Sequence, residues 1–255
     1  MMYHRFTKDS SEGYALKEEV FEKQIKFLRK TYTIIALEEY FNLTEREKSQ
    51  IPNPAAITVD DGYMNFYRYG YPVLNKYALP ATVYLPANFI ESGQWMWQDI
   101  NKFILRNSKK QQIHFEWKNN EYVLPLSSRS DLMMSLEKVY ELCMNEPNRE
   151  RGIFSRSLAD AAGVRVAEKP DDEFAPLTWE QIKEMGKNRI YFGSHTMNHE
   201  VLTKMDSHLA KEEIARSKNF LEGRLAQEIK GFCYPNGSYN IEISKQVEAC
   251  GYRYA

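Results

Sequence analysis

Strand-like and helix-like patterns alternate along most of this sequence, and this alternation restricts the fold more than any other feature. Short apolar runs rich in β-branched and aromatic residues predict strands, whereas apolar residues three and four positions apart predict helices. The predicted strands are 55–59, 81–85, 190–193, 231–234 and 252–255. The predicted helices are 17–30, 65–77, 178–186, 207–225 and 241–250. Such alternation favours an α/β fold with parallel strands and helices outside them.

The middle of the chain breaks the alternation. Residues 111–125 predict a β-hairpin, 129–144 a helix and 163–175 a loop. We therefore expect one domain, residues 1–255, with an insertion at about 91–176 between two strands. Trp95 and Trp97 lie at the start of that insertion, where they could stack on a sugar ring or simply pack.

Composition excludes several classes of protein. Lys and Arg number 34 against 35 Asp and Glu, so no basic excess points to a nucleic-acid partner. The sequence contains no run of about 18 apolar residues, so it predicts no membrane-spanning helix. The N-terminus has no apolar core of a signal peptide, which favours the cytoplasm. The three cysteines give neither a disulfide framework nor metal-ligand spacing. Nothing here indicates an oligomeric state.

Two adjacent carboxylates follow the first of these buried strands. The segment 55–59 runs directly into Asp60, Asp61 and Gly62. In parallel α/β folds, functional sites are built at the carboxyl ends of strands. Successive side chains of a strand leave in different directions, so one carboxylate can bind a metal while the other acts as a base. The alternative is an ordinary Asp-Gly turn, which by itself is the simpler explanation.

Two of the five histidines follow another predicted strand. His195 and His199 are four residues apart, and on a helical turn they share one face and can bind one metal. Two unrelated surface histidines are the alternative. Together with one carboxylate, the pair would form a facial triad that activates water.

Two further segments carry weaker signals. Residues 232–237 are a strand that enters a Pro-Asn-Gly turn, whose backbone N–H could bind an oxyanion. His4 lies so close to the N-terminus that, without other information, it reads as a bystander.

Three motifs in this order, 58–62, 195–199 and 234–237, resemble the polysaccharide deacetylases with a NodB-homology domain, carbohydrate esterase family 4. The resemblance covers residues 2–90 and 176–255. It implies an α/β fold, a distorted (β/α)7-type barrel. It also implies one divalent metal, usually Zn²⁺, with Co²⁺, Ni²⁺ or Fe²⁺ as alternatives. The implied reaction is hydrolysis of an N-acetyl group on an amino sugar of a polysaccharide or glycan precursor.

The resemblance also implies roles for individual residues. Asp60 is the general base. The metal ligands are Asp61, His195 and His199. The loop amide near Asn236, together with Tyr63, serves the oxyanion or substrate. The family usually has an arginine that orients the base where this chain has Cys233, and a thiol cannot form a charged fork.

A second departure concerns the general acid. The family's usual acid histidine, in a Leu-x-His motif, has no counterpart in this sequence. One branch, the exopolysaccharide (poly-N-acetylglucosamine) deacetylases, carries a motif that residues 2–6 resemble. This resemblance makes His4 the expected acid and Arg5 a replacement for the base-orienting arginine. The first strand is then expected at the edge of the sheet, beside the strand that carries Asp60 and Asp61.

Two other functions stay open at this stage. One is a non-catalytic sugar-binding protein on the same fold, although a purely structural metal site would not need Asp60. The other is a metal amidohydrolase of a small, non-sugar amide. In the preferred interpretation, the partner is an N-acetylated glycan substrate.

Overall fold

The structure is a computed structural model that describes residues 1–8, 15–144 and 146–255. The chain divides into two compact units. The first unit joins Met1–Gly93 to Asp171–Ala255 and carries every predicted site residue, and the second is Gln94–Pro170. That the whole chain acts as one domain with an insertion stays a prediction.

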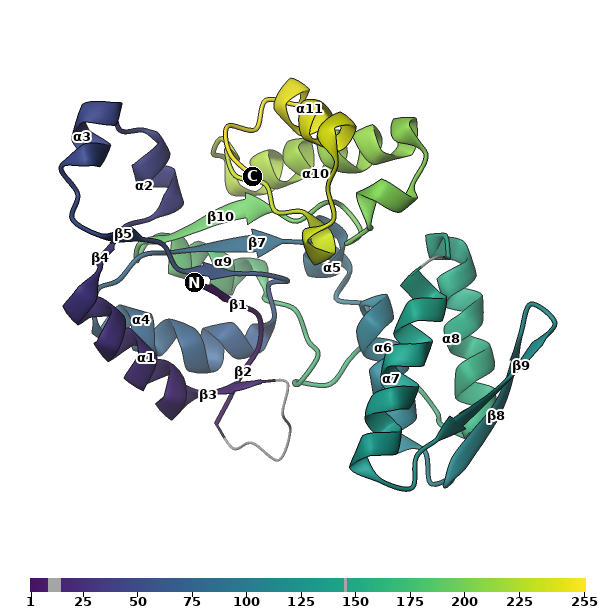
Figure 1. Cartoon of the computed structure of the whole chain (residues 1–255). Coiled ribbons are helices and arrows are strands. Elements are labelled where there is room, and N and C mark those ends of the chain that lie inside the picture. The colour runs from purple at the N-terminus through teal and green to yellow at the C-terminus, as the bar shows by residue number, and fades with distance from the viewer. Residues whose placement is uncertain (9–14, 145) are drawn as a thin grey trace. The chain divides into compact units, whose positions relative to one another are not determined.

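A parallel sheet lies at the centre of the first unit (Figure 1). Its strands, in spatial order, are β1 (Met2–Tyr3), β6 (Thr58–Val59), β7 (Ala81–Leu85) and β10 (Ile190–Ser194). Parallel bridges continue the series from Ser194 to Phe232 and from Gly231 to Tyr254. The predicted parallel arrangement is confirmed, and β1 lies at the edge beside β6, as expected for the strand that precedes His4.

Two more pairs of short parallel strands belong to this unit. They are β2 (Phe6–Thr7) with β3 (Leu16–Lys17), and β4 (Thr33–Ile34) with β5 (Pro54–Ala55). The predicted strand 55–59 is therefore two strands, because its first residue pairs with β4 while Thr58 and Val59 pair with β1 and β7. The predicted strands 231–234 and 252–255 reduce to single bridges.

Helices surround the sheet, with α1 and α4 on one side and α10 and α11 on the other (Figure 1). The helices of this unit are α1 (Glu18–Thr31), α2 (Leu37–Phe41), α3 (Glu45–Ser49), a π-helix (Phe66–Gly70) leading into α4 (Tyr71–Lys76), α5 (Ala87–Ser92), α9 (Trp179–Gly186), α10 (Ser207–Leu225) and α11 (Ile241–Ala249). Two 3₁₀ turns, Leu202–Lys204 and Pro235–Gly237, complete it. Pro72 lies in the first turn of α4, directly after the π-helix.

An aromatic cluster fixes the N-terminal segment against the core. The Phe21 ring meets the rings of Tyr3 and Phe6 edge-on, with both centroid distances 4.9 Å. Phe6 also packs on Phe66 at 5.6 Å. Aromatic rings bury large areas in this geometry. The two residues between Tyr3 and Phe6 are therefore held in place although they lie near the chain's start.

The second unit is a hairpin packed with three helices. It contains α6 (Trp97–Asn107), β8 (Gln112–Trp117), β9 (Asn120–Pro125), α7 (Arg129–Met144) and α8 (Asn148–Ala162). The predicted hairpin and the helix 129–144 are confirmed, whereas α6 and α8 were not predicted. Trp97 stacks on Tyr140 at 5.3 Å, and the Trp95 indole N–H donates to the carbonyl of Ala167. Both tryptophans thus take part in packing within this unit.

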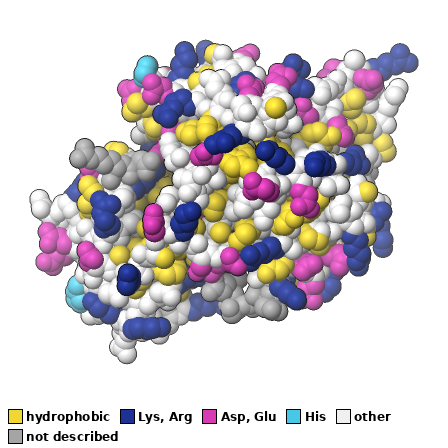
Figure 2. Space-filling view, turned by 180° about the vertical axis from the view of Figure 1, so that it is seen from behind, with side chains coloured by type: hydrophobic (Ala, Val, Ile, Leu, Met, Phe, Trp, Pro, Cys, Tyr) yellow, Lys and Arg dark blue, Asp and Glu magenta, His cyan; other side chains and the backbone are white. Residues whose placement is uncertain are grey.

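Two surface properties follow from the described residues. No helix among them is long and apolar enough to cross a membrane. Figure 2 shows one face, on which Lys and Arg side chains are interspersed with Asp and Glu side chains. On that face the described residues form no continuous field of one charge, in line with the net charge of −1.

Candidate active site

The end of β6 forms a sharp turn that separates the two aspartates. The Asp60 N–H still donates to the Tyr3 carbonyl across the sheet, at 2.9 Å. Asp61 and Gly62 then adopt left-handed backbone conformations, with φ of 70° and 67°. A Cβ on Gly62 would lie 2.8 Å from the Leu85 side chain, so glycine is favoured there by both space and backbone conformation. The Asp-Gly turn is therefore present, and it carries the two carboxylates of the candidate site.

The loop after β10 brings the two histidines together. The His195 N–H donates to the carbonyl of Leu85, at the end of β7. The imidazole rings of His195 and His199 lie edge-to-face with centroids 4.8 Å apart. The predicted helical turn is wrong, because Thr196 and His199 have φ of 67° and 55°. The rings meet through a loop with two left-handed residues.

A buried glutamate on α10 holds this loop, and the sequence analysis missed it. Glu213 Oε2 accepts the backbone N–H groups of Met197 and Asn198 at 3.0 and 2.9 Å. Its Oε1 accepts the Asn198 side-chain amide. In the sequence, Glu213 could have been found as an acidic residue beside Ala210 and Ile214, on the apolar face of a predicted helix. From the other side, the first residues of α5 donate to the carbonyls of residues 196 and 197.

Asp61, His195 and His199 form a buried group that can hold a cation. Asp61 Oδ1 lies 3.5 Å from His195 Nε2 and 3.2 Å from His199 Nε2. All three ligand atoms lie within 4.8 Å of one another. Although both nitrogens are close, Asp61 Oδ1 accepts a hydrogen bond from no described residue. Two imidazole nitrogens and one carboxylate oxygen, grouped in this way, are a ligand set that fits a divalent transition metal.

The charges in this group favour an ionised carboxylate. Burial raises the pKa of Asp61, but the two imidazoles outweigh burial and hold it well below the usual range. Burial by itself lowers the pKa of both histidines. It prevails for His199, whereas Asp61 raises the pKa of His195 above its ordinary value. An ionised Asp61 is the form that binds a metal.

Asp60 lies in a different environment from its neighbour. Only 4% of it is exposed, and burial raises its pKa against the opposing effects of His195 and His4. Its Oδ2 accepts a hydrogen bond from the Cys233 thiol at 3.5 Å. Its Oδ1 is buried and has no partner within the described residues. A carboxylate with a raised pKa and one unpartnered oxygen suits a general base.

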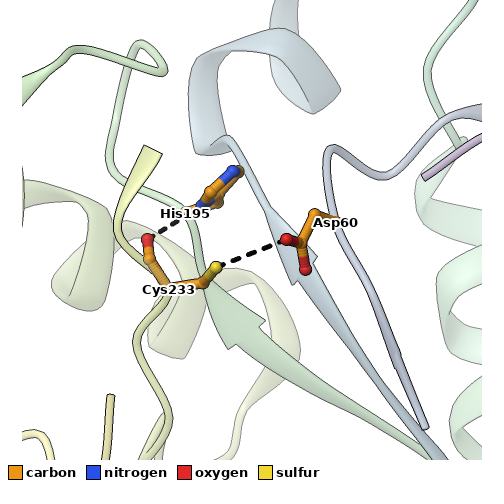
Figure 3. A group of neighbouring side chains, drawn as sticks. All are labelled: Asp60, His195 and Cys233. Atoms are coloured by element: carbon orange, nitrogen blue, oxygen red, sulfur yellow. Dashed lines mark hydrogen bonds between the residues drawn. The ribbon is translucent and has the colours of Figure 1, made fainter. Parts of the chain in front are cut away.

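Asp60, His195 and Cys233 also lie close enough to be considered as metal ligands (Figure 3). His195 belongs to both groups. Its Nδ1–H donates a hydrogen bond to the Cys233 carbonyl oxygen at 2.8 Å. Burial raises the pKa of the Cys233 thiol, which disfavours the thiolate that a metal needs. The group around Asp61 is therefore the better cation site.

His4 lies at the same site. Its Nε2 is 3.8 Å from Asp60 Oδ2, and 45% of its side chain is exposed. This placement follows from the parallel pairing of Tyr3 with Val59, which sets the next residue of each strand side by side. His4 therefore stands between solvent and the buried carboxylate.

Comparison with known proteins identifies the family. The sequence matches the polysaccharide deacetylase family over residues 47–122 and 152–255, more than half of the chain. The chain belongs to the polysaccharide deacetylase family. The Bacillus subtilis (strain 168) protein YxkH is 23% identical over 254 residues. That match covers 99% of this chain, which spans 61% of the length of YxkH.

Solved structures agree in fold. The Streptococcus pyogenes deacetylase PplD, solved in complex with acetate, has a TM-score of 0.63 at 19% identity. The match covers 99% of this chain and 80% of PplD. IcaB from Ammonifex degensii has a TM-score of 0.60 at 18% identity, covering 98% of this chain and 79% of IcaB. These likenesses confirm the predicted fold, the distorted (β/α)7-type barrel of NodB-type deacetylases.

Three other predicted site residues of this family member are placed less directly. The Arg5 guanidinium donates to Glu173 and lies 4.8 Å from the Tyr63 ring centroid. Tyr63 is buried, and its ring meets Phe89 edge-on. Asn236 is exposed in the 3₁₀ turn after Cys233, with φ of 57°. A base-orienting role for Arg5 and oxyanion or substrate roles for Tyr63 and Asn236 stay predictions.

Proposed function

We propose that this protein is a metal-dependent hydrolase that removes N-acetyl groups from an amino-sugar polysaccharide or glycan precursor. One observation carries the proposal: a buried group of one carboxylate and two imidazoles lies next to a second buried carboxylate. Membership of the polysaccharide deacetylase family supports the substrate class. So does the acetate bound to PplD, since acetate is the acid that deacetylation releases.

We further propose that Asp61, His195 and His199 hold Zn²⁺, an ion that suits mixed nitrogen and oxygen ligands. Bound Zn²⁺ supplies Lewis acidity, which lowers the pKa of water to about 7 and polarises an amide carbonyl. Asp61 provides the negative charge of the site, and the Cys233 carbonyl keeps His195 in the tautomer whose Nε2 is unprotonated. Co²⁺, Ni²⁺ and Fe²⁺ fit the same donors.

The remaining residues handle protons. Asp60 takes a proton from the attacking water, and the His4 imidazolium gives one to the departing amine nitrogen. The distance of 3.8 Å between His4 Nε2 and Asp60 Oδ2 supports this assignment of acid and base. Positioned acids and bases of this kind typically contribute about 10²- to 10⁴-fold each. Amine departure needs the acid, because an amine anion is a very poor leaving group.

Asp60 also argues against a sugar-binding protein without catalysis. Burial of a carboxylate costs free energy unless it is paired, and Asp60 Oδ1 has no partner among the described residues. A site that only bound a cation or a sugar would gain nothing from this arrangement. A proton-accepting role explains it.

Acetate release from different substrates tests the proposal. Zn²⁺-loaded protein is incubated with N-acetylglucosamine oligomers and, separately, with small amides such as acetanilide. We expect acetate from the oligomers and little from the small amides, with Asp60→Asn as the inactive control. Equal rates on both substrates would favour an amidohydrolase of small amides. Sugar binding with no acetate from either would favour the non-catalytic alternative.

A further inference from the structure

Cys233 contacts both halves of the site, one through its backbone and one through its side chain (Figure 3). Its N–H donates to the Ser194 carbonyl at 2.8 Å, which fixes Cys233 beside the end of β10. Its carbonyl oxygen lies 2.8 Å from His195 Nδ1. Its thiol donates to Asp60 Oδ2 at 3.5 Å, within the range for sulfur. One residue therefore connects a proposed metal ligand with the proposed base.

The backbone contact does not depend on the side chain at position 233. A carbonyl acceptor at Nδ1 requires a proton there, and a neutral imidazole then has an unprotonated Nε2. His195 Nε2 is the atom that faces Asp61 Oδ1. A substitution of Cys233 that keeps the backbone in place should consequently leave metal binding intact.

The side-chain contact determines which oxygen of Asp60 is available. Cys233 and His4 both approach Oδ2, at 3.5 and 3.8 Å. Oδ1 is buried without a partner among the described residues. A thiol is a neutral donor, so it can orient the Asp60 carboxylate. A cationic donor would also stabilise the negative charge of that carboxylate strongly.

We propose that Cys233 is a positioning residue: its thiol holds Oδ2 of Asp60 so that Oδ1 is the oxygen that accepts the proton of the attacking water. The inference rests on the proposed deacetylase function. It predicts a defect in the chemical step, with binding of the metal and of the glycan unchanged.

Three variants test this, assayed as the full Zn²⁺-loaded chain on N-acetylglucosamine oligomers. Cys233→Ala removes the donor, and we expect kcat to fall by about 3- to 10-fold, as for one lost hydrogen bond, with KM unchanged. Cys233→Ser keeps a donor of similar size, and we expect kcat within about 1.5-fold of the parent protein. Cys250→Ala removes a cysteine at the end of α11 and should leave both constants unchanged.

Metal content and the visible spectrum of the Co²⁺-substituted protein give the second measurement. Both should be the same in Cys233→Ala and in the parent, since the backbone carbonyl that contacts His195 remains in this variant. The inference is overturned if Cys233→Ala keeps the parental kcat, if Ser and Ala lose kcat equally, or if KM alone changes. A changed Co²⁺ spectrum or lost metal also overturns it. An inactive parent protein would instead refute the proposed function, which separates the two failures.

Discussion

The two halves of the candidate site differ in how tightly they are built. The metal half, Asp61, His195 and His199, is buried throughout, with at most 6% of any residue exposed. Its contacts to the shared carboxylate oxygen are 3.2 and 3.5 Å. The proton half, Asp60, His4 and Cys233, has contacts of 3.5 and 3.8 Å, and 45% of the His4 side chain is exposed.

This difference matches what each half has to do. A cation site works best when its ligands are held rigidly by surrounding hydrogen bonds. Glu213 and the start of α5 supply that rigidity for the loop between the histidines. Residues that gain and lose protons need access to water and room to move. We therefore expect substitutions in the metal half to remove the cation, and substitutions in the proton half to slow the reaction with the cation retained.

The largest effect should come from the metal half. His195→Ala or His199→Ala leaves two ligands, so we expect metal content far below one per chain and activity at background. Elemental analysis of the purified variants measures this. His208→Ala is the matched control, because that side chain is 78% exposed on α10. One full equivalent of metal in His195→Ala would contradict the ligand assignment.

Asp60→Asn should separate the halves most clearly. It removes the proposed base but keeps the size of the side chain, so we expect kcat to fall by about 10²- to 10⁴-fold. Metal content should stay close to that of the parent protein, as measured on the same samples. If the variant loses its metal, the roles of Asp60 and Asp61 are exchanged.

The sequence predicted the metal half better than the proton half, for a physical reason. Asp61, His195 and His199 each follow a strand within a short segment, so parallel pairing alone brings them to one edge of the sheet. The shape of the histidine loop was not predictable, because its left-handed residues depend on Glu213 and α5. These lie elsewhere in the chain, and local patterns do not show them.

The proton half depends on contacts between distant segments. The alternation of strands and helices cannot show that the Cys233 thiol meets Asp60, which lies 173 positions earlier. The sequence analysis noted Cys233 only because it stands where the family usually has an arginine. His4 was predicted through a family resemblance, and the pairing of β1 with β6 now brings it to Asp60. Helices α6 and α8 were missed for a related reason, since their buried faces pack in the core of their own unit.

His4→Ala should slow only reactions that need the acid. We expect kcat for the glycan amide to fall by about 10²-fold with little change in KM, since the proton is needed in the transition state. Aryl acetate esters have a good leaving group and should be hydrolysed at nearly the parental rate. His114→Ala, in the second unit, is the control. Equal losses on amide and ester would contradict the assignment of His4 as the acid.

Glu213→Gln should produce the smallest change and extends the comparison beyond the direct ligands. Glu213 accepts three hydrogen bonds on two oxygens, whereas glutamine has one acceptor oxygen. Loosening the loop between the histidines should weaken metal affinity by about tenfold, the lower end for groups that orient metal ligands.

Competition with a chelator measures that affinity, and kcat at saturating Zn²⁺ should stay close to the parental value. Glu212→Gln, its exposed neighbour on α10, is the matched control. Because Glu213 accepts its hydrogen bonds from the loop of the metal half, a loss of kcat at full metal occupancy would contradict the separation of the two halves. It would mean that the histidine loop also sets the position of Asp60 or His4.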